Sequence, residues 1–335
     1  MALNWGIIGM GDIADRVMAP AMAQACNNRL VAVMRRDRKK AEELAHKHGA
    51  QRSYGSVQEI LCDDGIDAVY IATPVSCHAN QTIEAAEHGK HVLCEKPMAM
   101  TVEEAEAMVT ACEAHNVKLM VCYYQRFNRR HQQIRKLLQT EAIGQVTALR
   151  LSFCSLGRDD PTSWRQDPAI GGGGNLMDCG SHCVDLLRFL VGEPHAVSAF
   201  VDTLAFSYPV DDTATMLLKL ESGAHAVISA HWSTLVPGEQ DSSSLAIYGT
   251  EGAIYSAPLH DKHSRGTLKL MTRSEQRQYC FEQSTHVALL EAFAGSIEAD
   301  SQAPISGYDG LRASQIIAAG YESARSGRVV PVVPP

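Results

Sequence analysis

Residues 9–14 read Gly9-Met10-Gly11-Asp12-Ile13-Ala14, and they directly follow the apolar run Trp5–Ile8. In this G-x-G-x-x-A spacing the first glycine permits a tight turn, and the second lets the backbone approach a ligand closely. The small alanine lets the following helix pack against the strand. Free N–H groups at the start of that helix favour an anionic group such as a pyrophosphate. Because an apolar strand precedes the pattern, we predict a dinucleotide-binding turn made by Gly9, Met10, Gly11, Asp12, Ile13 and Ala14.

Short apolar runs alternate with longer helical patterns from the start of the chain to about residue 124. Most of the runs are almost continuously apolar, as in parallel strands that helices cover on both faces. They are Trp5–Ile8, Leu30–Met34, Gln51–Tyr54, Ala68–Ala72, His91–Cys94 and Lys118–Cys122. Ser56 and Thr101 each precede a glutamate by three residues, which predicts a capping box at the start of two of the helices. We therefore predict a Rossmann domain over residues 1–124, an α/β fold with a doubly wound parallel sheet.

The remaining residues, 125–335, contain strand-like runs joined by short turns. Such turns favour antiparallel pairing, so we predict a C-terminal α+β domain with a large, mostly antiparallel, open-faced sheet. The runs are Val146–Phe153, Ala196–Leu204, Thr213–Leu220, Ala224–Trp232, Ser244–Tyr248, Ala253–Ser256, Leu268–Thr272 and Tyr279–Phe281. Too few helices follow to cover both faces, and the last, about 311–326, can pack back on the first domain. We expect this domain to bind substrate and to pair through its open sheet face in a homodimer or homotetramer.

Composition narrows the possible partners. Thirty Lys and Arg against 38 Asp and Glu give a net charge of −8, so the chain repels phosphate backbones and anionic lipid. We expect no nucleic-acid or membrane partner, and the start of the chain has no basic leader. The 10 cysteines form no C-x-x-C pair, which favours reduced thiols and a cytoplasmic location.

The turn after the second apolar run bears on the choice of nicotinamide cofactor. An acidic residue at this turn usually binds the ribose 2′-hydroxyl of NAD and repels the 2′-phosphate of NADP. Here the turn reads Arg35-Arg36-Asp37, and paired guanidinium groups suit a phosphate. We therefore favour NADP(H) over NAD(H). Two other interpretations stay open: a solvated basic loop, and Asp37 as helix cap or ribose ligand.

Two further segments carry chemistry. Glu95-Lys96-Pro97 follows the run His91–Cys94, and open α/β sheets bind ligands at the carboxyl ends of their strands. A lysine that loses hydration there has a lowered pKa and can exchange a proton. Downstream, a run of four glycines that we expect to be flexible leads into a helix. Asp178 and His182 are four residues apart on that helix and therefore share one face.

With Thr73-Pro74 and His78, these motifs resemble the glucose–fructose oxidoreductase/inositol dehydrogenase (Gfo/Idh/MocA) family over nearly the whole chain. The resemblance implies an NAD(P)-dependent enzyme that transfers a hydride to or from a sugar, polyol or related hydroxy or carbonyl compound. It implies His182 as general acid/base, Asp178 as its orienting partner or a substrate-hydroxyl ligand, and Lys96 as the group that polarises the substrate oxygen. It also implies a Lys96–Pro97 peptide that is often cis. With the two arginines, the expected cofactor-binding residues outside the glycine turn are Arg35, Arg36, Thr73, Pro74, His78, Glu95, Lys96 and Pro97.

Other possibilities stay open beside this one. A nucleotide-binding sensor of the same fold would lack catalysis, and a glycosidase with tightly bound NAD would show no net redox change. Cys179 and Cys183 flank His182, but Cys179 points away from the Asp178 face, so we predict no metal site. Arg126 either contacts substrate or braces a helix. Trp164 and Arg165 are candidate substrate contacts, in the first of two expected specificity loops, 157–174 and 235–241.

Overall fold

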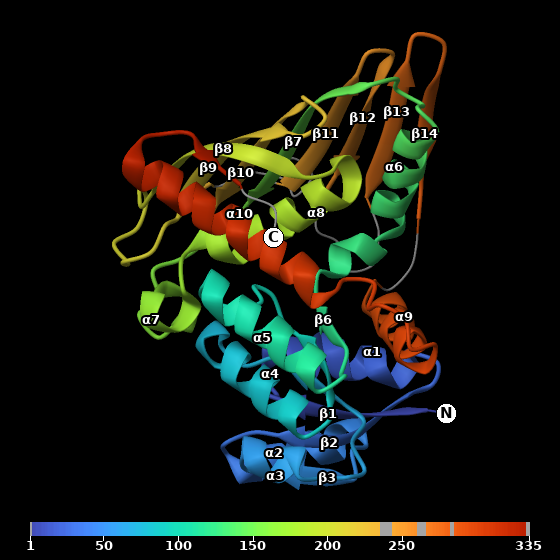
Figure 1. The fold of residues 1–335 in the computed structure, drawn as a ribbon, viewed down its shortest axis with the longest axis vertical. Helices are drawn as coiled ribbons and strands as arrows, with labels where there is room; N and C mark the ends of the chain where they lie inside the picture. Colours follow the sequence, from blue (N-terminus) through green and yellow to red (C-terminus); the bar gives the residue numbers. More distant parts are fainter. Residues whose placement is uncertain (1, 235–242, 260–265, 282–284, 333–335) are drawn as a thin grey trace. The chain divides into compact units, whose positions relative to one another are not determined.

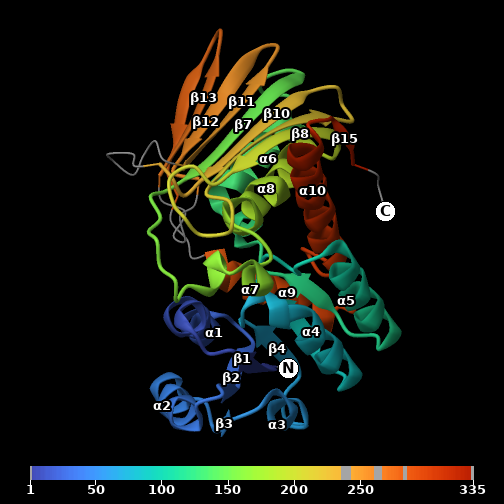
Figure 2. The ribbon, with the colours of Figure 1, turned by 90° about the vertical axis from the view of Figure 1, so that its left-hand side faces the viewer.

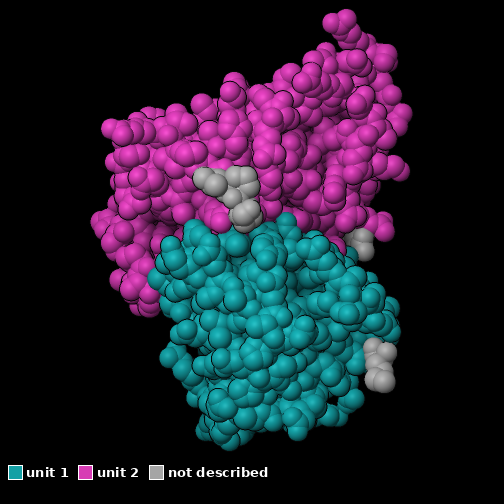
Figure 3. Space-filling model, viewed as in Figure 1, with its two compact units in different colours: residues 1–123, 286–311 teal, residues 124–285, 312–335 magenta. Residues whose placement is uncertain are grey.

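The protein divides into two compact units, which Figure 3 colours separately. The computed structural model describes residues 2–234, 243–259, 266–281 and 285–332. Unit 1 comprises residues 1–123 and 286–311, and unit 2 comprises residues 124–285 and 312–335. The chain therefore enters unit 2 at Tyr124, returns to unit 1 at His286 and leaves it again at Arg312. The expected specificity loop 235–241 lies outside the described residues.

Unit 1 contains a six-stranded parallel sheet with the order β3-β2-β1-β4-β5-β6. This order confirms the predicted doubly wound fold, because the chain starts at β1 in the middle and builds outward in both directions. β1, β4 and β5 are almost fully buried, as their apolar sequences predict. The strands are β1 (Leu3–Ile8), β2 (Asn28–Met34), β3 (Arg52–Tyr54), β4 (Ala68–Ile71), β5 (His91–Cys94) and β6 (Leu119–Val121).

Helices cover both faces of this sheet (Figure 2). α1 (Ala19–Gln24), which continues the π-helical turn η1 (Ala14–Met18), and α2 (Arg38–His48) lie on one face. On the other face lie α3 (Val57–Leu61), α4 (His78–Glu87) and α5 (Val102–Ala114). From late in the chain, α9 (Thr285–Glu298) joins unit 1, where Phe293 packs against Trp5 with ring centroids 5.8 Å apart.

One of the two predicted capping boxes is complete. At α3 the Ser56 hydroxyl accepts from the Glu59 backbone N–H, and the Glu59 carboxylate accepts from the Ser56 N–H. At α5 the Thr101 hydroxyl accepts from Glu104 N, but the Glu104 carboxylate accepts from Met100 N at 2.9 Å. The reciprocal half of that box is therefore displaced by one residue, because the carboxylate reaches the preceding N–H.

Unit 2 contains a nine-stranded sheet with the order β14-β13-β12-β11-β7-β10-β9-β8-β15. Neighbours are antiparallel except β7 and β10, which are parallel. The prediction of a large, mostly antiparallel sheet is confirmed. The strands are β7 (Val146–Cys154), β8 (Pro194–Asp202), β9 (Thr213–Leu220), β10 (His225–His231), β11 (Ser243–Gly249), β12 (Gly252–Ala257), β13 (Thr267–Thr272), β14 (Gln276–Tyr279) and β15 (Val330–Pro331).

Helices lie along one side of this sheet in both ribbon views (Figures 1 and 2). They are α6 (Arg129–Gln139), α8 (Ser181–Val191) and the unit-2 part of α10 (Gly307–Ser326). The opposite face carries exposed apolar side chains, with Phe200 77% and Leu217 54% exposed. All 10 cysteines are free thiols. Among the described residues no helix has the length and hydrophobicity that crossing a membrane requires.

Candidate functional site

The turn after β1 has the shape that its glycines predict. Gly9 has φ +87°, and a Cβ there would overlap Thr73 in the loop after β4. The Gly9 and Met10 N–H groups donate to Met34 O at the end of β2, both at 3.3 Å. A Cβ on Gly11 would find only Gly9 O, at 3.8 Å. The space above Gly11 is therefore open, as a backbone that must approach a pyrophosphate requires.

The two arginines after β2 have different surroundings. The Arg35 side chain donates from Nη1 to Met10 O at 2.7 Å, which ties it to the glycine turn. Arg36, the next residue of the same turn, is exposed. The Asp37 carboxylate caps α2, accepting from Lys40 N at 3.2 Å. Of the alternatives for Asp37, the structure therefore favours the helix cap.

His78 joins the loops after β4 and β5. Its Nε2 lies 2.9 Å from Thr73 O, and its Nδ1 lies 3.0 Å from Pro97 O. The imidazole is 1% exposed, and this burial lowers its pKa although the two carbonyls oppose the shift. The His78 ring therefore lies between the loop of Thr73-Pro74 and the loop of Lys96-Pro97 and contacts a backbone carbonyl of each.

Glu95 anchors the Lys96-Pro97 turn. Its carboxylate accepts hydrogen bonds from the Tyr70 hydroxyl and, at 3.1 Å, from the Lys96 N–H. Burial raises the pKa of Tyr70 well above its ordinary value, and the Glu95 charge adds to this effect, so the hydroxyl keeps its proton and donates. The Lys96–Pro97 peptide is cis, as the family resemblance implies.

In unit 2, Asp178 lies on the π-helical turn η5 (Leu176–Gly180) that precedes α8. An ion pair links it to Arg165, with Nε 3.5 Å from Oδ2. The Arg165 guanidinium also stacks over the Trp164 ring, 4.4 Å from its centroid. Two of the predicted substrate contacts thus lie beside a predicted catalytic carboxylate.

His182, one turn further, is 4% exposed and lies against two aromatic rings. Phe153, near the end of β7, stacks with the imidazole at an interplanar angle of 7° and 6.1 Å between centroids. Tyr124 meets the imidazole edge-on at 5.2 Å. Stacking on one face and an edge contact restrict the rotation of the ring.

Arg126 binds Asp185 of α8 in a bidentate ion pair. Its Nη2 lies 2.7 Å from Oδ1, and its Nε lies 3.0 Å from both carboxylate oxygens. The Asp185 side chain is almost fully buried in this pair. This geometry favours the interpretation of Arg126 as a brace for α8.

The glycine run before η5 is packed, so the expectation that it is flexible is wrong. A Cβ on Gly173 would overlap the Tyr321 hydroxyl, and one on Gly174 would overlap the Asp211 backbone. Backbone blocks a side chain at Gly174, and a side chain at Gly173 would have to displace the Tyr321 hydroxyl.

The structure therefore brings the predicted residues together in two groups, one in each unit. In unit 1 the glycine turn, Arg35, the Thr73 loop and the Glu95-Lys96-Pro97 turn meet at the carboxyl ends of β1, β2, β4 and β5. In unit 2, Asp178 and His182 share one helical segment with Arg165 and Trp164 beside it. Sequence reasoning missed Tyr70 and Phe153, whose positions in apolar strands resemble ordinary core positions. Among the described residues no His, Cys, Asp and Glu cluster has the arrangement of a metal site.

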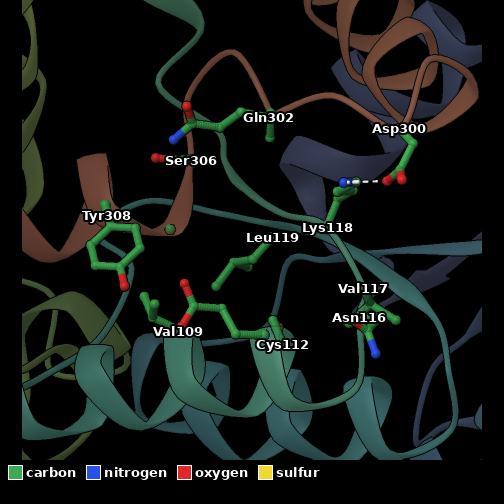
Figure 4. A pocket seen from close by; sticks show the side chains of 13 residues that line it. Val109, Cys112, Asn116, Val117, Lys118, Leu119, Asp300, Gln302, Ser306 and Tyr308 are labelled. Carbon is green, nitrogen blue, oxygen red and sulfur yellow. Dashed lines mark hydrogen bonds and ion pairs between the residues drawn. The ribbon is translucent and has the colours of Figure 1, made fainter.

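Two surface pockets of unit 1 lie elsewhere. One, of about 480 Å³, lies between α5 and the first residues of α10, and Lys118, paired with Asp300, borders it (Figure 4). The other, of about 600 Å³, includes Leu3 at the start of β1 and His91 at the start of β5. Both adjoin the amino ends of strands, whereas ligands of open α/β sheets bind at the carboxyl ends. No predicted site residue borders either pocket.

Comparisons of the sequence and of the structure with known proteins both identify oxidoreductases. Residues 3–123 match the NAD-binding Rossmann fold of the GFO/IDH/MocA oxidoreductase family, and residues 131–255 match the GFO/IDH/MocA C-terminal domain. D-xylose 1-dehydrogenase (NADP(+)) 2 of Haloferax volcanii is 29% identical over 98% of this chain and 99% of its own. Trans-1,2-dihydrobenzene-1,2-diol dehydrogenase of Xenopus laevis is 32% identical over 76% of this chain and 75% of its own. The structure of levoglucosan dehydrogenase in complex with NADH and levoglucosan superposes with a TM-score of 0.90 at 27% identity, covering 99% of this chain and all of that one.

Proposed function

Because the chain belongs to the Gfo/Idh/MocA oxidoreductase family, we propose that it transfers a hydride between a nicotinamide cofactor and a carbon bearing a hydroxyl or carbonyl group. The observation that carries this proposal is the open space at Gly11, with the Thr73 and Lys96 loops fastened beside it through His78. The named relatives act on a sugar, on a cyclic 1,2-diol and on levoglucosan. We therefore assign this chain a sugar, polyol or similar polyhydroxylated substrate.

In this proposal His182, Lys96 and Asp178 have different roles at the substrate. When bound, the nicotinamide gives or takes the hydride. Oxidation of a hydroxyl releases a proton, and reduction of a carbonyl consumes one, so a side chain at the substrate oxygen must exchange it. His182 takes this role, with its ring held by Phe153 and Tyr124. Lys96 polarises the same oxygen, and Asp178 orients His182 or binds a neighbouring substrate hydroxyl.

The cofactor is NADP(H) in this proposal. Arg36 extends from the turn after β2 in an exposed position, where its guanidinium can bind a 2′-phosphate. The Asp37 carboxylate caps α2 and lies 3.6 Å from Lys40 Nζ, which offsets part of its negative charge. Arg35 supports the glycine turn through Met10 O and adds a second positive charge.

The test is a panel of sugars, polyols and cyclic diols, with oxidation and reduction followed by nicotinamide absorbance. Replacing His182 with Ala, or Lys96 with Met, should lower kcat by roughly 10²–10⁴-fold, the usual contribution of a positioned acid or base. Cofactor affinity of His182→Ala, measured by nicotinamide fluorescence, should change little. His195→Ala, at an exposed position of β8, is the matched control and should keep full turnover.

Two outcomes would contradict the proposal. Cofactor binding without turnover of any panel member would indicate a nucleotide-binding sensor. Glycoside cleavage without a net change in nicotinamide absorbance would indicate a glycosidase that retains its NAD.

A further inference from the structure

Two segments far from η5 in the sequence hold the backbone that leads into it. Gly173 and Gly174 precede η5, and their missing side chains leave room for Tyr321 of α10 and for the backbone of Asp211. An alanine methyl group at Gly174 would overlap backbone atoms, and one at Gly173 would displace the Tyr321 hydroxyl from its place. The glycines are therefore required by tight packing, and the segment is docked against fixed neighbours.

Asp211 binds three consecutive backbone N–H groups at the start of this helical segment. Its Oδ1 accepts from Gly174 N at 2.9 Å, its Oδ2 accepts from Leu176 N at 2.7 Å, and its own carbonyl accepts from Asn175 N at 2.9 Å. The first N–H groups of a helix have no partner within the helix, and a side-chain oxygen usually satisfies one of them. Here Asp211 alone satisfies three of these N–H groups. Three fixed points define both the position of the helical segment and its rotation about its axis.

Tyr321 holds the Asp211 carboxylate in turn. Its hydroxyl donates to Oδ1 at 2.7 Å. Burial and the nearby Asp211 charge raise the pKa of Tyr321 well above its ordinary value, so it remains a donor at any physiological pH. Asp211 is 7% exposed, and such a buried carboxylate depends on fixed donors around it.

Asp178 is only two residues after Leu176, the last residue whose N–H group Asp211 binds. Asp178 N donates to Gly174 O at 3.0 Å, so the first helical hydrogen bond starts from the glycine that Asp211 holds. His182 follows on the same segment. A rigid-body shift of the segment would move both side chains together, and displacements of about 1 Å can cost roughly 100-fold in rate.

We propose that Asp211 and Tyr321 are positioning residues, which set the place and rotation of the helical segment that carries Asp178 and His182. This inference rests on the proposed function, because it assumes that these two side chains act on substrate. Asp211 and Tyr321 themselves touch neither substrate nor cofactor in this assignment.

The main test is Tyr321→Phe, which keeps the ring and removes the hydrogen bond to Asp211. We expect kcat to fall about 10-fold, with the cofactor dissociation constant unchanged, because the proposed cofactor-binding residues all lie in unit 1. Hydrogen–deuterium exchange followed by mass spectrometry should show faster exchange in peptides that cover Gly174–Leu176. Asp211→Asn should lower kcat further, since its amide would present N–H donors to backbone N–H groups.

Ser323→Ala is the matched control on the same helix. Its buried hydroxyl accepts from Ala199 N at 3.0 Å and donates to Arg328 O at 2.6 Å, so it joins α10 to β8 and the C-terminal segment. The control should lose thermal stability comparable to Tyr321→Phe but keep kcat and the exchange rate of Gly174–Leu176. An equal loss of kcat in both variants would show a general structural effect and overturn the inference.

Failure of the inference can be separated from failure of the proposed function. If His182→Ala and Asp178→Asn lose turnover while Tyr321→Phe keeps it, the positioning role is wrong and the function stands. If His182→Ala and Asp178→Asn both keep full turnover, the assignment of these two side chains is wrong and the positioning role falls with it, while hydride transfer itself stands. If the unmodified protein binds cofactor but turns over no member of the panel, the proposed function is wrong.

Discussion

Neighbouring side chains of one type can have different tasks, as Arg35 and Arg36 show. Arg35 is partly buried, and its guanidinium binds the carbonyl of Met10, so part of its hydrogen-bonding capacity supports the glycine turn. Arg36 is exposed at the same turn. Unlike a substitution of Arg35, a substitution of Arg36 therefore leaves the hydrogen bond to Met10 O intact.

Charge reversal at Arg36 tests cofactor selection at this scale. Arg36→Glu should weaken NADP binding by about 10- to 100-fold, because each lost charge-assisted hydrogen bond contributes on the order of 1.5–3 kcal/mol. NAD binding should change by less than about threefold, since NAD has no 2′-phosphate there. Titration of both cofactors by fluorescence measures this, with Lys39→Glu, an exposed reversal on α2, as control. Equal affinity of the unmodified protein for NADP and NAD would refute the proposed preference.

At the scale of elements, the outer face of the unit-2 sheet carries a small group of exposed apolar side chains. Leu217 of β9 pairs with Val227 of β10, and Phe200 lies on the neighbouring strand β8. Because alternate residues point to opposite faces, Leu217 and Phe200 are exposed while Met216 and Leu218 are buried in the core. Large exposed apolar side chains on a sheet face indicate an interaction surface.

We expect two copies to pair through this face. Leu217→Asp should shift the mass measured by light scattering towards the monomer, because a carboxylate would lose its hydration in the interface. The monomer fold should be unaffected, since the side chain is 54% exposed. Leu204→Asp, at a 71% exposed position just beyond β8, serves as control. A stable monomer of the unmodified protein at micromolar concentration would contradict this assembly.

At the scale of the whole molecule, buried histidines link stability to pH. Burial and, to a smaller extent, the Arg130 charge lower the pKa of His131 to about 3, although the Gln125 carbonyl opposes the shift. His131 is completely buried, and its Nδ1 lies 2.9 Å from Gln125 O. Burial also lowers the pKa of His78, His91 and His231. His131 is therefore neutral in the folded protein at pH values where the unfolded chain binds a proton, and the other three histidines shift in the same direction.

The sign of the effect follows from these shifts. The folded pKa of His131 lies below its unfolded value of about 6.5. The free energy of unfolding therefore keeps its full value with respect to His131 above about pH 6.5 and decreases as the pH falls below that value. Between the folded and the unfolded pKa, one such histidine lowers the free energy of unfolding by about 1.4 kcal/mol for each pH unit. Thermal unfolding at pH 7.5 and 5.5 should show less acid destabilisation in His131→Gln than in the unmodified protein. His46→Gln, at an exposed position of α2, should leave the difference unchanged; an unchanged difference in His131→Gln as well would contradict the prediction.

Much of the fold follows from short stretches of sequence, because the interactions that define it are local. The apolar runs of the first 124 residues correspond to β1 to β6 with shifts of one or two residues at their ends. The glycine turn, the Ser56 capping box and the strands between short turns depend on neighbours within a few residues, which the sequence shows directly. The positions of the predicted cofactor and catalytic residues, at strand ends and on one helical segment, could be predicted for the same reason.

Other features depend on residues distant in the sequence, and only the tertiary structure reveals them. The glycines before η5 resemble a flexible connection until Asp211 and Tyr321 are seen in the space of their missing side chains. Phe153 resembles any strand residue until it is found stacked on His182. His131 stands in a polar segment but is completely buried. Local pattern determines which element forms, because hydrogen bonding and periodicity act over a few residues. Packing determines what each residue does there, since it depends on the segments that the folded chain brings alongside.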